Sequence, residues 1–519
     1  MLLKLRAIFS PIHFPFVILR WILLFIRKKP EKIPPITDPL FTLSATTLAK
    51  KIRQREITCY DAVHEYTLQI KRVNPVLNAV AGNRFGDAVY EAKICDEQLA
   101  AGKIDIERLE KEKPLFGVPI TVKECCAVKG CSHSGCSLPL EKRKASCDAE
   151  IIKLLRNAGA IPVCVTNTSE MCAGFDSSNL LYGRTYNPYD TRYMSAGSSG
   201  GEGALLGSGA SVIGIGSDFA GSIRVPSLFN GVFGHKPTSG IVPTNGHLPM
   251  YDPKFLSFGP MTRYAEDLVL VMKVLTSKCE RNLRLDDPVD LRQLKVYYRS
   301  SMDPAFGMSS TTPEMKDCVH KAMIHFTQYD IHPKELPIEW PTELVEILFA
   351  GWKIIKPPKI LVDPKNPKSK KNAIVEFLKS LLGLSQHTLQ ATLNNILLET
   401  RFPFSESDIS HYTKQGAKIR QELLDLLGEN GIFIYPTFRC PAILPELSIC
   451  EVLNIAYCGI FNNFGFPAVH IPMGLNREGL PIGVQVIAAP YQDRLCLAVA
   501  KELETAFGGW VPPSISISK

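Results

Sequence analysis

Three short stretches rich in glycine and serine carry the side chains that could do chemistry. They are Gly117-Val-Pro-Ile-Thr-Val-Lys123, Ala196-Gly-Ser198-Ser-Gly-Gly and Gly216-Ser-Asp218-Phe-Ala-Gly-Ser222-Ile-Arg224. Lys123, Ser198 and Ser222 are 75 and 24 residues apart along the chain. A serine hydroxyl is a weak nucleophile that needs an adjacent base. A lysine can be that base only when its amine is uncharged. The pattern therefore allows a serine nucleophile activated by a lysine.

Each of these three side chains also has a plain structural explanation. Lys123 follows an apolar stretch, Val-Pro-Ile-Thr-Val, which would carry it inward, but a surface lysine just past a strand end is the alternative. Ser198 could be a turn residue or a helix cap in a glycine-rich loop. Ser222 could cap the helix that starts near Ile-Arg. The residue types alone leave these alternatives open.

A rival nucleophile lies one residue further along. The segment Gly197-Ser-Ser199-Gly-Gly201 fits G-x-S-x-G, the turn that presents the nucleophile of α/β-hydrolases. That turn needs a strand directly before it, and residues 187–194 instead have the composition of a loop. It also needs a downstream histidine, and none of His235, His247 and His470 has a recognisable setting. The glycines of 201–207 fit neither a dinucleotide fingerprint nor a P-loop.

Charge is concentrated at the N-terminus. The chain has 519 residues and a net charge of +8, but residues 1–34 hold seven Lys/Arg against Glu31, which leaves only +2 for the rest. This distribution favours membrane lipids as a partner and argues against nucleic acid. The 15 cysteines are scattered without paired C-x-x-C motifs, so we expect free thiols in a reducing compartment, no metal and no cofactor.

The first 34 residues read as a membrane anchor with a basic flank. The apolar run from Phe14 to Ile26 is 13 residues long and contains Arg20, whereas a spanning helix needs about 20 apolar residues. No signal-cleavage site follows it. Two interpretations stay open: a signal-anchor spanning from Leu2 to Ile26, and a monotopic segment lying in one leaflet. The positive charge after Ile26 would keep that flank on the cytoplasmic side.

The remaining chain alternates predicted strands and helices, which indicates an α/β body with a mixed or parallel sheet. We expect strands at 116–122, 160–165, 432–435 and 483–487, and helices from Ser44, at 149–158, at 261–275 and along the apolar stretch 374–398. No internal repeat or second boundary is visible. The predicted organisation is therefore an anchor at 1–34, one catalytic domain at 36–512 and a short C-terminal tail at 513–519.

The three chemical stretches together resemble the amidase signature family, a group of serine hydrolases that act on amides. The resemblance continues through Asn187-Pro-Tyr-Asp190, Phe233-Gly-His-Lys-Pro237, Gly259-Pro-Met261, Gly465-Phe-Pro467 and Gly479-Leu-Pro-Ile-Gly-Val-Gln485. It covers nearly the whole chain after the anchor. It implies the amidase-signature fold, in which a large twisted mixed sheet is covered by helices on both faces.

Matched residue by residue, the resemblance implies a role for each polar group. Ser222 is the acyl nucleophile, Lys123 is the general base, and Ser198, on a cis peptide in the family, bridges the two. The backbone N–H groups of Phe219, Ala220, Gly221 and Ser222 form the oxyanion hole. Supporting roles fall to Ser199, Asp218 and Arg224, and no metal is implied.

The chain departs from the family where relatives carry Gly-Gly-Ser, because Ala196 and Ala220 replace the first glycine. If Ala220 needed a positive φ, this would cost about 1 kcal/mol.

Shorter phrases resemble the fatty-acid amide hydrolases within this family, above all the type with an N-terminal anchor. They are Leu48-Ala-Lys-Lys-Ile-Arg-Gln-Arg55, Gly216-Ser-Asp218 and Thr505-Ala-Phe-Gly-Gly-Trp510. They imply hydrolysis of primary fatty amides or N-acylethanolamines to a fatty acid and an amine. The expected location is an endomembrane, at the endoplasmic reticulum or lipid droplets, with the catalytic domain in the cytoplasm. Membrane lipids, a lipid-like amide and a second copy of the chain are the expected partners.

Three other functions stay open at this point. One is an amidase of small non-lipid amides, and another is a non-catalytic membrane scaffold on the same fold. The third is the family's tRNA-dependent amidotransferase subunit, which the anchor and the near-neutral body disfavour. The apolar stretch 374–398 could be a membrane-docking cap over an acyl channel, or an ordinary core helix.

Overall fold

The computed structural model describes residues 22–25, 29–101, 105–303, 308–356, 358–361, 363, 371–400 and 404–514. Most of the expected anchor, residues 1–21 and 26–28, falls outside these ranges. Within them, no helix combines the length and the apolar character that crossing a bilayer requires. Ile33 and Ile36 are buried in the hydrophobic core, so packing of the folded body already begins inside the proline-rich segment that follows the basic flank.

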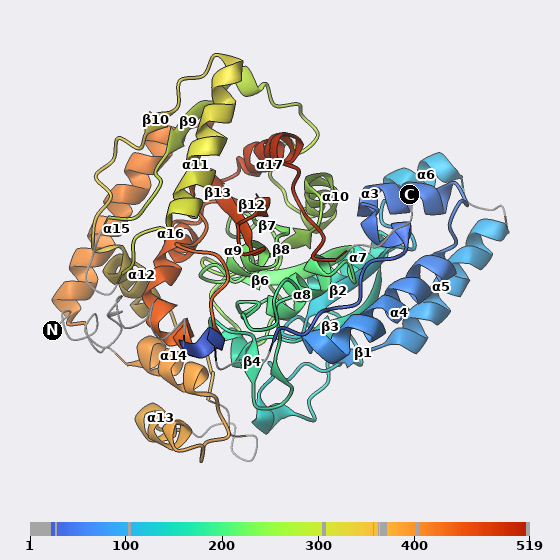
Figure 1. The fold of residues 1–519 in the computed structure, drawn as a ribbon, viewed down its shortest axis with the longest axis horizontal. Helices are drawn as coiled ribbons and strands as arrows, with labels where there is room; N and C mark the ends of the chain where they lie inside the picture. The colour runs from blue at the N-terminus through green and yellow to red at the C-terminus, as the bar shows by residue number, and fades with distance from the viewer. Residues whose placement is uncertain are drawn as a thin grey trace.

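The centre of the molecule is a mixed sheet, with eleven strands in the described part of the chain (Figure 1). Parallel pairing joins β3, β2 and β6 near one end and β11, β9 and β10 at the other, and the remaining neighbours are antiparallel. In spatial order the strands are β1 (Val80–Asn83), β3 (Ile161–Thr166), β2 (Pro119–Lys123), β6 (Ile213–Asp218), β8 (Ser257–Thr262), β7 (Phe233–Lys236), β12 (Ala468–Leu475), β13 (Pro481–Ala488), β11 (Gly431–Pro436), β9 (Lys295–Tyr298) and β10 (Lys334–Glu335).

Helices cover both faces of this sheet. Successive strand residues point to opposite faces, and in β11 Ile432 and Ile434 join one hydrophobic cluster whereas Phe433 and Tyr435 join the other. This confirms the predicted α/β fold. The helices are α3 (Ala45–Arg53), α4 (Cys59–Leu77), α5 (Phe85–Ala100), α6 (Ile106–Glu112), α7 (Glu150–Asn157), α8 (Gly200–Gly207), α9 (Arg224–Phe229), α10 (Ala265–Leu275), α11 (Pro313–His325), α12 (Leu344–Lys353), α13 (Ala373–Leu381), α14 (Leu389–Glu399), α15 (Glu406–Leu427), α16 (Ala456–Phe464) and α17 (Asp493–Phe507).

Local sequence signals account for several element boundaries. Ser44 caps α3, as predicted, because its hydroxyl accepts the Thr47 N–H at 3.0 Å. Two predicted helices differ from the structure. Met261 belongs to β8, where it pairs with Gly214, and the helix starts only at Ala265. The apolar run 374–398 is split into α13 and α14, and Gly383 between them adopts a left-handed φ of 68° that ends the first helix.

Candidate active site

Lys123 is the last residue of β2 and is fully buried. Because β2 pairs in parallel with β6, with Val122 opposite Ile215, the ends of both strands meet at one edge of the sheet. Lys123 Nζ lies 2.6 Å from Ser198 Oγ, 3.0 Å from Ser217 Oγ and 3.3 Å from the Ser217 carbonyl oxygen. In the part of the chain that the structure describes, no carboxylate is within ion-pair distance of this amine.

Ser198 is held by the loop that precedes α8. The Gly197–Ser198 peptide bond is cis, as the family resemblance implied. The Ser198 carbonyl accepts hydrogen bonds from Thr168 Oγ1 at 2.6 Å and Ser177 Oγ at 3.1 Å, which fix the loop. Gly197 has no room for a side chain, because a Cβ there would lie 2.6 Å from the Gly174 carbonyl oxygen. The backbone therefore aims the Ser198 hydroxyl at the lysine.

Ser222 follows β6 in the turn that leads into α9, and it is half-buried. Its carbonyl accepts the Ser199 N–H at 3.2 Å, which ties the two serine-bearing loops together. No described residue forms a hydrogen bond with Ser222 Oγ. Of the bridge expected at Ser198, the structure therefore contains the contact with Lys123 but no hydrogen bond to Ser222. Ser222 instead lines the cavity described below, as does Gly197. A substrate carbonyl in that cavity could reach it.

The turn around Ser222 also refines the expected oxyanion hole. The Gly221 N–H donates to Asp218 Oδ1 at 2.7 Å, so this group is already engaged. The N–H groups of Phe219, Ala220 and Ser222 remain as the candidate donors. Gly221 takes a φ of 114°, whereas the φ of Ala220 is not positive, so the methyl group of Ala220 causes no backbone strain. Of the two alanines that replace a family glycine, Ala196 is the one with a left-handed backbone, with a φ of 60°.

Asp218 and Arg224 form a fully buried ion pair, with Arg224 Nε 3.1 Å from Asp218 Oδ2. Burial alone would raise the pKa of Asp218, but the Arg224 guanidinium outweighs it and holds that pKa well below the usual range. Asp218 also accepts the N–H groups of Gly221 and Ile223. The pair therefore shapes the turn that presents Ser222.

Ser199 is not placed as an α/β-hydrolase nucleophile would be. It is fully buried at the N-cap of α8, and residues 187–199, all of which the structure describes, contain no β-strand. Its hydroxyl lies 3.4 Å from the Ser217 carbonyl oxygen and its N–H holds the Ser222 carbonyl. These contacts fit the supporting role and not the rival one.

A cavity of about 430 Å³ opens in front of Ser222. Its wall is largely aromatic and aliphatic, and Phe219 is central to it, with ring centroids 4.5 Å from Tyr251 and 5.3 Å from Trp352. The wall comes from α12, from α14, from the 3-10 helix η6 (Pro445–Ile455) and from the Ser222 turn. Its apolar members include Phe175, Phe349, Leu389, Leu393, Leu397, Val452 and Ile455.

Comparison with known proteins decides the family. The model of the amidase family matches residues 61–497. The human protein Fatty-acid amide hydrolase 2 is 39% identical over 498 residues, which cover 94% of this chain and 93% of that protein. The chain belongs to the amidase family. It is thus a hydrolase of amide C–N bonds. A second relative of this amidase, Fatty-acid amide hydrolase 2-A from Danio rerio, is 40% identical over 93% of the chain and 92% of the relative.

Solved structures agree with the fold of this amidase. A fatty acid amide hydrolase structure superposes with a TM-score of 0.71 at 20% identity, covering 91% of this chain and 86% of that one. A bacterial aryl acylamidase gives a TM-score of 0.72 at 20% identity, over 92% and 99% of the two chains. At this identity the likeness concerns the fold alone, and it confirms the large mixed sheet with its helices.

Two residues at the centre of the amidase site escaped the sequence reasoning. Ser217 contacts Lys123 through both its hydroxyl and its carbonyl oxygen. Glu202 lies buried beneath the site and accepts hydrogen bonds from Thr121 at 2.5 Å and Thr166 at 2.7 Å. Burial raises the pKa of Glu202 to about 8, although both hydroxyl groups oppose that shift. Ser217 stands inside a quoted motif and Glu202 directly follows another, but only the tertiary structure reveals what the two side chains contact.

Proposed function

We propose that this amidase hydrolyses fatty-acid amides through an acyl-enzyme on Ser222. The observation that carries the proposal is the buried 2.6 Å contact between Lys123 Nζ and Ser198 Oγ, beside a half-buried Ser222 that faces an apolar cavity. An ordinary surface lysine would be exposed or paired with carboxylates. Lys123 has only hydroxyl and carbonyl partners within hydrogen-bond distance among the described residues, as a base that must be uncharged requires.

In the proposed mechanism Ser222 Oγ attacks the amide carbonyl carbon, and its proton passes to Ser198 Oγ while the Ser198 proton passes to Lys123 Nζ. The carbonyl oxygen becomes an oxyanion, which the backbone N–H groups of the Ser222 turn stabilise. The C–N bond then breaks as the proton returns from Lys123 through Ser198 to the leaving nitrogen. Amines leave poorly, so this proton delivery is an essential part of the chemistry. Water next attacks the ester and releases the acid and Ser222.

A fatty acyl chain is the proposed occupant of the cavity. Aromatic and aliphatic side chains form most of its wall, and burial of apolar surface gains about 25 cal/mol per Å². The names of the relatives at 39% and 40% identity point to the same class of substrate. A binding site for small non-lipid amides would not need an apolar wall of this extent. This comparison supports a long acyl chain over a short one.

We also propose that the enzyme works at a cytoplasmic endomembrane surface. Five apolar side chains on and just after α13 are more than half exposed, namely Ile374, Leu378, Leu381, Leu382 and Leu384. A helix with such a face can lie in the lipid interface. The next helix, α14, packs against α13 and lines the cavity, so a lipid surface at α13 would be near the acyl-chain site. The basic apolar N-terminus would add a second attachment.

Replacement of Ser222 by alanine tests the chemistry. We expect Ser222→Ala to lose hydrolysis of long-chain amides by roughly 10⁴-fold or more, because the attacking oxygen is gone. It should also lose labelling by a fluorophosphonate probe, which reacts with an activated serine. The matched control Ser208→Ala removes another buried hydroxyl, which donates to the Leu205 carbonyl, and it should keep both properties.

Substrate length is tested by comparing the wild type with Ser222→Ala on a panel of amides whose acyl chains run from short to long. Wild-type turnover of long-chain amides that falls steeply as the chain is shortened supports the lipid assignment. Turnover of short soluble amides alone would overturn the assignment and leave the chemistry intact. A wild type that the probe does not label would instead indicate a scaffold.

A further inference from the structure

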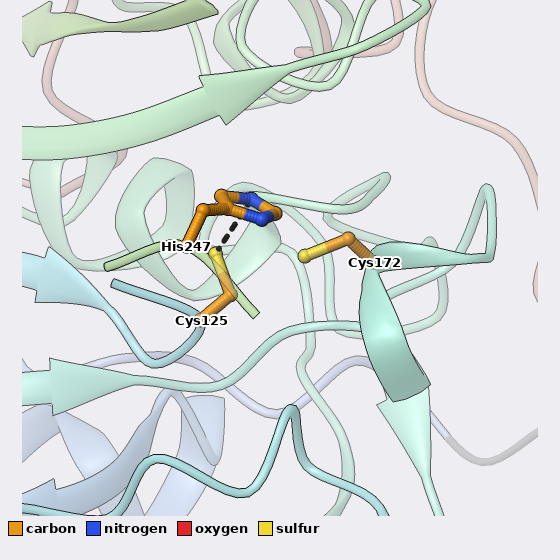
Figure 2. Close-up of side chains that lie close together, drawn as sticks. All are labelled: Cys125, Cys172 and His247. Atoms are coloured by element: carbon orange, nitrogen blue, oxygen red, sulfur yellow. Dashed lines mark hydrogen bonds between the residues drawn. The ribbon is translucent and has the colours of Figure 1, made fainter. Parts of the chain in front are cut away.

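A second group of reactive side chains lies directly behind the catalytic lysine. Cys125, Cys172 and His247 come from three separate segments, and Cys125 Sγ, Cys172 Sγ and one ring nitrogen of His247 all lie within 4.8 Å of one another. Figure 2 shows the two sulfur atoms and the imidazole pointing toward a shared space. Cys125 Sγ is 3.4 Å from His247 Nε2. All fifteen cysteines of the chain are free thiols, so these two are available as ligands.

The imidazole is oriented as a metal ligand would be. His247 Nδ1 lies 2.6 Å from the Pro249 carbonyl oxygen, and a carbonyl can only accept, so Nδ1 carries the proton. With the proton on Nδ1, Nε2 is left as the acceptor, and it lies 3.0 Å from Ser217 Oγ and 3.4 Å from Cys125 Sγ. A backbone carbonyl that fixes the ring in this way is the usual outer partner of a metal-bound histidine.

The separation between Cys125 and His247 also suits a tetrahedral ion. Zinc–sulfur and zinc–nitrogen bonds of about 2.3 and 2.0 Å place a sulfur and a nitrogen ligand about 3.5 Å apart around the metal. The observed distance between Cys125 Sγ and His247 Nε2 is 3.4 Å. Cys172 is held by a backbone in which both Met171 and Cys172 have positive φ, of 52° and 56°. Cys172 also lines the substrate cavity, which gives an ion a path from solvent.

We propose that Cys125, Cys172 and His247 form a site for a thiophilic divalent ion of the Zn²⁺ class, and that the bound ion inhibits the enzyme. Binding forms two metal–thiolate bonds and one metal–imidazole bond, and the two thiol protons are released to the solvent. The ion and two thiolates together carry no net charge, so a buried site tolerates them. The sequence predicted no metal because its cysteines are scattered without paired C-x-x-C motifs.

Inhibition follows from the hydroxyl that connects this site to the catalytic lysine. Ser217 Oγ is 3.0 Å from His247 Nε2 and 3.0 Å from Lys123 Nζ. Because Nε2 is an acceptor, the Ser217 hydroxyl donates to it and accepts from the lysine side. An ion that takes the Nε2 lone pair redirects the Ser217 proton toward Lys123 Nζ. Ser217 then competes for the nitrogen lone pair that Ser198 needs in the proposed mechanism.

Metal binding to the full-length chain is the direct test, and it does not depend on any substrate. The reduced, metal-free protein is titrated with cobalt(II) chloride, and the thiolate-to-cobalt absorption band is followed. We expect one equivalent to bind and zinc chloride to displace it. Cys125→Ala should weaken binding more than the 10- to 100-fold that loss of an outer partner costs. The matched control Cys126→Ala removes the adjacent buried thiol and should bind as the wild type does.

Activity and spectroscopy complete the test. Zinc chloride should inhibit the wild type and Cys126→Ala, a chelator should restore both, and Cys125→Ala should resist zinc relative to its own rate. Magnesium chloride should have no effect, because Mg²⁺ prefers oxygen ligands. X-ray absorption of the zinc-bound wild type should count two sulfur ligands and one imidazole, even if the variants fold poorly. Equal cobalt binding by Cys125→Ala and Cys126→Ala, or zinc-bound protein with an unchanged rate, would overturn the proposal.

Discussion

At the scale of single residues, the site depends on two buried ionisable groups close to each other. Lys123 ends β2, and Glu202 on α8 bonds to Thr121 two residues earlier on the same strand. Burial raises the pKa of Glu202 to about 8, so this carboxyl group carries its proton in the folded protein over a range where it is ionised in the unfolded chain. The protonated carboxyl group still bonds to the hydroxyl groups of Thr121 and Thr166, and it adds no negative charge near Lys123.

Glu202 therefore makes stability depend on pH. The folded pKa of about 8 exceeds the ordinary glutamate pKa of 4.5, so the favourable contribution of this group is full below pH 4.5 and is lost as the pH rises through 8. Glu202→Gln mimics the protonated acid. We expect the free energy of unfolding of the wild type, relative to the variant, to fall by on the order of 1 kcal/mol per pH unit within this window. Urea unfolding at pH 5, 6.5 and 8 measures it.

The control for this prediction is Glu97→Gln, which replaces an exposed carboxyl group. Its difference from the wild type should stay constant over the same range of pH. A Glu202→Gln difference that is equally constant would show that the carboxyl group is ionised in the folded protein.

At the scale of elements, the split of the apolar run 374–398 gives its two halves different tasks. In α14, Leu389, Leu393 and Leu397 line the cavity, whereas α13 presents leucines to solvent. One continuous helix could not do both. The turn around Gly383 instead reverses the chain, and α13 packs against the outer side of α14 (Figure 1). Exposed apolar surface of this kind marks an interaction site. The proposed membrane contact is therefore assigned to α13, and the proposed acyl-chain site to the cavity that α14 lines.

Charge on the exposed face of α13 should weaken membrane attachment. We expect Leu378→Glu combined with Leu382→Glu to lower binding to anionic phospholipid vesicles at least about tenfold, which corresponds to 1.4 kcal/mol. The effect should be larger in a chain lacking residues 1–28, which keeps the buried Ile33 and leaves α13 as the remaining proposed attachment. Vesicle co-sedimentation measures it, and turnover of a short soluble amide should stay unchanged.

Ile324→Glu is the control for α13, since it places one glutamate, half the charge added in the double variant, at an exposed isoleucine on α11. It should bind vesicles as the unmodified chain does. Equal binding by all these variants would locate the membrane contact elsewhere.

At the scale of the whole molecule, one buried arginine joins segments from distant parts of the sequence. Arg224 Nη1 donates to the Cys458 carbonyl at 3.1 Å and to Gln485 Oε1 at 3.0 Å, and Nη2 donates to Asn462 Oδ1 at 2.6 Å. It also pairs with Asp218. The turn that carries the nucleophile is therefore anchored on α16 and β13, which the chain forms only near its C-terminal end.

Loss of this arginine should destabilise the entire fold. Arg224→Met leaves the Asp218 carboxylate buried without its partner, so we expect a loss of about 3–5 kcal/mol in the free energy of unfolding. Adding Asp218→Asn should restore part of it, because the unpaired charge is removed. Chemical denaturation measures both variants.

The comparison for Arg224 is Arg108→Met, which breaks an exposed pair with Glu112 and should change the free energy of unfolding far less. If Arg224→Met costs no more than this control, the buried pair does not hold the turn.

The amino-acid sequence determined the family, the mixed α/β sheet and the three residues of the catalytic hypothesis. These features could be predicted because their signals are short motifs, in which glycines, a serine and a strand end are neighbours along the chain. Only the tertiary structure decided which distant groups meet. It brought Ser217 to Lys123, Gln485 to Arg224, and two cysteines to one histidine, because strands that pair in space need not be adjacent in sequence. It also decided that Glu202 is buried, since burial depends on every element packed around it.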